Sequence, residues 1–132
     1  MADLTISTIT VPNSQGDGSY TAGEAIAAGE VVYLDETTGK VFLAKCDDAN
    51  RIGAIGFAVN TAAINQSVAI NASQVMTVNS AAVSTLYFLS TTAGKIFLES
   101  DLSSTDYKVI MAIGSLATAL TPRIWGTGIQ KP

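Results

Sequence analysis

The feature that most constrains the fold is an internal repeat of a short apolar–turn–apolar segment. Residues 31–43 align with residues 86–98 at an offset of 55, and six of the 13 aligned positions are identical. In each copy a polar loop ends in glycine, Gly39 in the first and Gly94 in the second. Glycine adopts a positive φ without the steric cost of a Cβ atom, as many hairpin loops require. The repeat therefore predicts two β-hairpins in two related β units, because two copies are too few for a solenoid.

Further apolar runs, mostly of four to eight residues, extend each copy and predict additional strands. We align Ala54-Ile55-Gly56 of the first copy with Ala112-Ile113-Gly114 of the second. Gly53 and Gly56 lie inside one run and predict a bend or bulge there. The runs are apolar at both alternating positions, which predicts burial on both faces of each strand. The expected strands are 31–34, 40–44, 52–59 and 66–70 in the first copy, and 86–89, 95–98, 107–116 and 122–125 in the second.

The first 18 residues differ from the rest of the chain. Leu4, Ile6 and Ile9 supply an apolar stretch, and a Gly-, Ser- and Asn-rich loop follows at 12–19. Such a stretch is either the first strand of the sheet or an arm that pairs with another chain. We expect an N-terminal arm and loop at 1–18 and a single β domain at 19–132, with the repeat at about 26–70 and 81–126. The fold class expected is all-β, a compact small barrel or sandwich.

The composition excludes several functional classes. The chain has no histidine, which excludes Ser-His-Asp and Cys-His catalytic arrangements. Its net charge is −4, and its seven basic residues are scattered singly, so we expect no nucleic-acid or anionic-membrane partner. The single cysteine, Cys46, cannot form an intrachain disulfide and is interpreted as a small buried or half-buried hydrophobe. Gly-rich phosphate-binding motifs are absent. We therefore expect no enzymatic activity and no cofactor.

Acidic and aromatic residues are the remaining candidates for chemistry. The acidic loops at 47–50 and 99–106 are the best candidates for calcium, but they lack EF-hand spacing and are interpreted as solvated turns, with no metal. The aromatic repeat mates Tyr33/Phe88 and Phe42/Phe97 lie within apolar runs and are expected in the core. Trp125 has no aromatic mate and is either a core cap or an interface anchor.

The N-terminal sequence gives no targeting signal. It lacks the basic and apolar regions of a signal peptide, and no apolar stretch in the chain reaches the ~20 residues of a membrane span. We expect synthesis in a cytoplasm without membrane insertion.

Three segments carry a resemblance to a known family. AGEVVYL at 28–34, TGKV at 38–41 and IGAIGFA at 52–58, followed by the short run SVAI at 67–70, resemble small head proteins of tailed bacteriophages. Over residues 22–126 the chain is similar to capsid decoration, or cement, proteins of that group. The resemblance implies a β-tulip-like, barrel or sandwich fold and a homo-oligomer, with a trimer favoured. It implies no catalytic residue, because the role of that family lies in its surfaces.

Two functional hypotheses follow from the residues and the resemblance together. The first is a structural protein that binds the major capsid protein on the outer capsid surface of the virion, after synthesis in the cytoplasm of a host bacterium. Its candidate partner-binding residues are Leu4, Ile6, Ile9 and Trp125. The second is a tail-fibre or receptor-binding module that recognises a host-surface glycan, which predicts exposed aromatic side chains away from the repeat.

Overall fold

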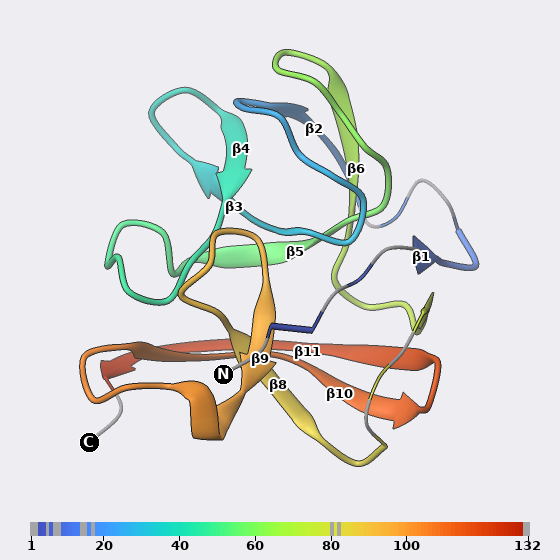
Figure 1. The fold of residues 1–132 in the computed structure, drawn as a ribbon. Helices are drawn as coiled ribbons and strands as arrows, with labels where there is room; N and C mark the ends of the chain where they lie inside the picture. The colour runs from blue at the N-terminus through green and yellow to red at the C-terminus, as the bar shows by residue number, and fades with distance from the viewer. Residues whose placement is uncertain are drawn as a thin grey trace.

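The protein is all-β, with a closed five-stranded barrel above a six-stranded sheet (Figure 1). The computed structural model describes residues 3–4, 6, 9–13, 16, 18–79, 81 and 83–130, except for the side chains of 125–130. One 3-10 turn, Glu99–Asp101, interrupts the strands of this part. In chain order the strands are β1 (Ile9–Thr10), β2 (Gly18–Ala22), β3 (Val31–Asp35), β4 (Lys40–Leu43), β5 (Ala54–Ala58), β6 (Ser67–Asn71), β7 (Met76–Val78), β8 (Leu86–Leu89), β9 (Ile96–Leu98), β10 (Tyr107–Leu116) and β11 (Ala119–Gln130). The predicted all-β class is confirmed. In the described residues no helix is long and apolar enough to cross a membrane.

The two hairpins that align in the sequence pair in the same register. Tyr33 lies opposite Phe42 in the β3–β4 hairpin, and the corresponding Phe88 lies opposite Phe97 in the β8–β9 hairpin. Their loop glycines have positive φ as predicted, 72° at Gly39 and 80° at Gly94. The repeated sequence therefore encodes a repeated local structure, position for position.

The equivalence of β5 and β10 differs from the sequence alignment by two residues. Gly56 pairs with Val32 on β3, whereas Ala112 pairs with the corresponding Tyr87 on β8. Gly56 therefore corresponds to Ala112, and the alignment of Gly56 with Gly114 was wrong. A two-residue shift keeps every side chain on the same face of a strand, so the apolar pattern alone does not reveal it. Both pairings also skip one residue next to this position, so the bulge predicted in the first unit occurs in both.

The strands of the two units follow the same spatial order but close differently. The order β2-β6-β5-β3-β4 of the barrel is repeated as β7-β11-β10-β8-β9 in the sheet. In the barrel, β2 also pairs in parallel with β4, which closes the ring. In the sheet, β7 and β9 are not paired with each other. The N-terminal segment pairs instead with each of these two strands, at the position where the ring would otherwise close. We call this position the seam.

The N-terminal segment reaches both sides of the seam within a few residues (Figure 1). Leu4 forms an antiparallel bridge with Ile96 on β9, and Ile9 pairs with Val78 on β7. Five residues of extended chain span at most ~18 Å. Six strands of a flat sheet would place their outer strands ~24 Å apart. The sheet must therefore be strongly curled. The second unit is thus a barrel with a gap between β7 and β9, and the N-terminal segment bridges that gap.

Strands β3 and β5 are buried on both faces, as the apolar pattern predicted. Val31 and Phe57 belong to the main cluster between barrel and sheet, whereas their neighbours Val32 and Ala58 belong to the cluster inside the barrel. All four side chains are 0% exposed. The main cluster comprises Val11, Val31, Ala44, Cys46, Phe57, Met76, Val78, Tyr87, Phe88, Leu89, Ile96, Phe97, Leu102, Val109, Met111, Ala112 and Leu120.

The aromatic repeat mates offer a matched test of this packing. Phe97 is fully buried in the main cluster, whereas its mate Phe42 is half-buried. Phe97→Ala should lower the free energy of unfolding by ~3–5 kcal/mol, because it removes a buried ring and leaves a cavity. Phe42→Ala should lower it by about half as much or less, since the ring keeps contact with water in the folded state. Urea unfolding of both variants measures the difference, and equal losses would contradict the assignment of the core.

Candidate functional site

The described candidate contact residues of the N-terminal segment lie against the chain's own core. Leu4, Ile6 and Ile9 are half-buried and pack on the main cluster. The Leu4 amide donates a hydrogen bond to the Ile96 carbonyl oxygen at 2.8 Å, and the buried Ser90 hydroxyl donates to an Asp3 carboxylate oxygen. Of the two alternatives for this segment, the folded chain by itself adopts the strand. Binding of these residues to a partner stays a prediction.

Ile6 occupies a notch that exists because residue 29 is glycine. A Cβ atom at Gly29 would lie 2.6 Å from the Cγ2 atom of Ile6, and Gly29 has a φ of 92°. The Gly29 amide donates to the Ala58 carbonyl oxygen at 2.7 Å, which fixes this loop on the barrel. Gly29 belongs to the AGEVVYL segment that carries the resemblance, but its role as a seat for Ile6 depends on a tertiary contact.

Trp125 lies on β11, where its backbone pairs with Ile110 of β10. Its side chain is outside the described part of the structure. Its assignment as a core cap or an interface anchor therefore stays open.

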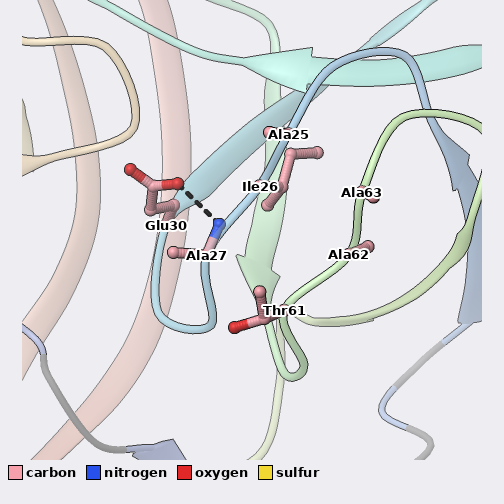
Figure 2. A pocket seen from close by; sticks show the side chains of 7 residues that line it. All are labelled: Ala25, Ile26, Ala27, Glu30, Thr61, Ala62 and Ala63. Atoms are coloured by element: carbon pink, nitrogen blue, oxygen red, sulfur yellow. Dashed lines mark hydrogen bonds between the residues drawn. The ribbon is translucent and has the colours of Figure 1, made fainter.

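A shallow, open depression of about 360 Å³ lies on the barrel, between the loop before β3 and the loop before β6 (Figure 2). An antiparallel bridge between Ile26 and Ala62 joins the two loops. Figure 2 shows Glu30 on one side and Ala63 on the other. One Glu30 carboxylate oxygen accepts from the Ala27 amide at 2.7 Å and the other lies 3.5 Å from Lys95 Nζ. This carboxylate is thus engaged in the fold, and the rest of the wall is mainly alanine methyl groups.

The acidic loops close their own turns. Asp48 accepts a hydrogen bond from the Asn50 amide at 2.9 Å, and the buried Asp106 accepts from the Ser103 amide at 2.8 Å. Glu99 forms an ion pair with Lys108 at 2.6 Å. Across the described residues, no group of three or more Asp, Glu, Cys or His side chains is placed to hold a metal ion. These hydrogen bonds are those expected of acidic turns.

Cys46 lies between the two units and is fully buried, the first of the two alternatives that the sequence left for it. Its side chain is 0% exposed. Its amide donates to the Ser90 carbonyl oxygen at 2.9 Å, and its own carbonyl oxygen accepts from the Tyr107 amide at 2.8 Å. Burial raises the pKa of the thiol to about 12, and the charges of Asp106 and Asp47 add to the rise. The thiol is therefore protonated at neutral pH.

Three exposed apolar side chains, which the sequence did not reveal, lie on neighbouring segments at one end of the six-stranded sheet. Val83, Leu86 and Leu116 are 54%, 45% and 65% exposed, and we call these three residues the apolar corner. Hydrogen bonds join the loop before β8 to Gly114 on β10, which brings the two segments together. Leu86 and Leu116 lie on the same face of the sheet, because their cross-strand partners Ile113 and Ala119 are on that face. In Figure 1 the loop before β8 and the tip of the β10–β11 hairpin lie at the same end of the sheet.

No protein-family model matches the chain, and no curated protein matches it.

Substitution of Gly29 tests the seat of Ile6. Gly29→Ala and Gly39→Ala both place a Cβ at a positive φ, but a Cβ at Gly39 meets nothing within 4 Å. Both variants should lose ~1 kcal/mol of unfolding free energy from backbone strain. Gly29→Ala should lose a further ~1–3 kcal/mol because it displaces Ile6. In an Ile6→Ala background the extra loss of Gly29→Ala over Gly39→Ala should shrink. Denaturant titration of both glycine variants, each with and without Ile6→Ala, measures this coupling. An unchanged excess would show that Ile6 does not sit on Gly29.

The thiol of Cys46 gives a pH-dependent test of burial. Because only the thiolate reacts, a thiol reagent at pH 8 should leave the folded chain unmodified and label the unfolded chain promptly. The unfolded thiol has an ordinary pKa of 9.0, so between pH 9 and about 12 it ionises before the folded one does. Stability should therefore fall with rising pH in that window, and fall less in Cys46→Ala. Prompt stoichiometric labelling of the folded chain at pH 8 would contradict the burial.

Proposed function

We propose that this chain is a structural protein that binds the outer surface of a tailed-phage capsid as a homo-oligomer, with a trimer favoured, and bridges neighbouring major capsid subunits. The observation that carries the proposal is the apolar corner of Val83, Leu86 and Leu116 on a body of closed and nearly closed sheets. Exposed apolar patches on a rigid body mark protein–protein contact sites. The resemblance of the repeated hairpin to decoration proteins supplies the identity of the partner.

The apolar corner suits attachment to a repeating surface. Burial of a half-exposed Leu or Val side chain contributes ~1 kcal/mol, so a single copy of the corner binds weakly. A symmetric oligomer presents several corners at once, and their effective concentration converts weak contacts into firm attachment. Because such an oligomer binds the assembled shell and not dissociated subunits, it stabilises the shell by linkage. The net charge of −4 favours solubility of copies that are not yet attached.

The glycan-binding alternative gains no specific support. It predicts exposed aromatic platforms, but the aromatic side chains of the described part are buried or half-buried. They are Tyr20, Tyr33, Phe42, Phe57, Tyr87, Phe88, Phe97 and Tyr107.

Charge substitution at the apolar corner tests the proposal. Leu116→Asp should lower occupancy on expanded capsids at least about tenfold, because it places a charge in a desolvated contact. Ile64→Asp is the matched control, since Ile64 is 60% exposed on the barrel, away from the corner. Co-sedimentation of capsids with increasing protein measures occupancy, and urea midpoints check that both variants fold equally well.

Two outcomes would count against the proposal. Equal occupancy of Leu116→Asp and the unmodified chain would remove the corner from the contact. Cryo-electron microscopy of the native particle that shows no copy of the chain on the shell would remove the function itself.

A further inference from the structure

The second β unit is incomplete without a strand that the first unit does not use. In the barrel, Thr21 and Ala22 of β2 pair directly with Lys40 and Val41 of β4. The corresponding strands β7 and β9 do not pair with each other, although the other strand neighbours in the unit are the same. The seam therefore presents two strand edges, and the N-terminal segment bonds to both.

The seam has specific contacts for an extended strand. On the β9 side it offers the Ile96 carbonyl oxygen to the Leu4 amide and the buried Ser90 hydroxyl to a carboxylate. Next to these is the Gly29 notch, which holds the Ile6 side chain. On the β7 side, Thr77 and Val78 pair with the following residues of the segment. The seam thus accommodates a carboxylate followed by spaced apolar side chains, which Asp3, Leu4, Ile6 and Ile9 supply.

The pairing that holds this strand is short. The described residues give it one bridge to β9 and two paired residues on β7. Strands with so few pairs open at a small fraction of the global unfolding free energy. Opening leaves two unpaired edges, which favour pairing with another strand.

We propose that the seam is a strand-acceptor site for a second copy of this chain, so that copies exchange their N-terminal segments. The exchanged segment makes the same contacts as the segment of the same chain, and the balance is set by effective concentration. Each copy donates one segment and accepts one, so the exchange closes either as a two-fold dimer or as a small head-to-tail ring. This gives a mechanism to the homo-oligomer of the proposed function, and its test in solution needs no capsid.

A disulfide between chains tests the exchange in the full-length protein. Leu4 and Ile96 are an antiparallel pair, whose Cα atoms lie about 4.5–5.5 Å apart, within the range of a disulfide. A Leu4→Cys chain is mixed with a tagged Ile96→Cys chain and oxidised. The expected product is a mixed disulfide dimer, about tenfold above that of Leu4→Cys with tagged Thr38→Cys, whose cysteine lies on an exposed loop. Buried Cys46 does not compete.

A chain with both substitutions, Leu4→Cys and Ile96→Cys, shows whether the N-terminal segment pairs within its own chain or with a second copy. When dilute, it should form the disulfide within one chain, and when concentrated, between chains. In-chain disulfide at every concentration, with no mixed dimer above the control pair, would overturn the exchange. Absence of any disulfide would overturn the seam itself.

A second measurement does not depend on cysteine variants. The unmodified chain should sediment as an oligomer at micromolar concentration, and Ile6→Asp should shift it to monomer while Ile64→Asp leaves it unchanged. Circular dichroism checks that Ile6→Asp remains folded. A monomeric unmodified chain at millimolar concentration would overturn the proposal, whereas capsid binding by such a monomer would leave the proposed shell function standing.

Discussion

The structure depends on two strands that are buried on both faces. Val31 and Phe57 point into the cluster beneath the barrel, and Val32 and Ala58 point into the barrel itself. A strand with one polar face could line only one of these cores. Separation of barrel and sheet would expose Val31 and Phe57, which are 0% exposed in the folded chain. The two units therefore share one hydrophobic interface and are stabilised together.

Backbone hydrogen bonds reinforce this interface. The Val31 amide donates to the Gly94 carbonyl oxygen at 2.9 Å, and the Gly94 amide donates to the Ala44 carbonyl oxygen at 2.7 Å. The loop of the second hairpin is therefore anchored on the start of the first. Because the bonds are buried beside apolar side chains, their loss would leave unsatisfied polar groups. This couples the repeated hairpins to each other as well as to their own sheets.

The sequence predicted local structure better than closure. All eight expected strands occur. Apart from the end of the last one, their ends lie within three residues of the expected positions, because apolar runs and loop glycines mark them directly. The last strand begins at Ala119 and extends to Gln130, beyond its expected limits. Strands β2 and β7 were not predicted, since GSYTA and MTV are short and mixed in polarity. Their strand state depends on pairing with β6 and β11, which no local pattern encodes.

The candidate site was harder to predict for the same physical reason. Leu4, Ile6 and Ile9 were recognised as an apolar stretch, but whether they cover the chain's own seam depends on Gly29 and Ile96, which are distant in sequence. The apolar corner was missed because Leu86 and Leu116 belong to strands whose other face is core. An apolar residue in a strand gives no sign of which face is left uncovered until the sheet is assembled.

The two related units close differently. The closed first unit is the rigid part, and the open second unit carries the surfaces that we propose for contact. The first unit satisfies its strand edges within the ring, so its backbone gives a partner few hydrogen-bonding groups. The second unit leaves β7 and β9 to be completed by a terminal segment, and it carries the apolar corner at its end. Backbone pairing at the seam gives strength and register, whereas the corner gives apolar area without a fixed direction. Under the two proposals, the duplicated fold gains its contact surfaces from the copy that is left open.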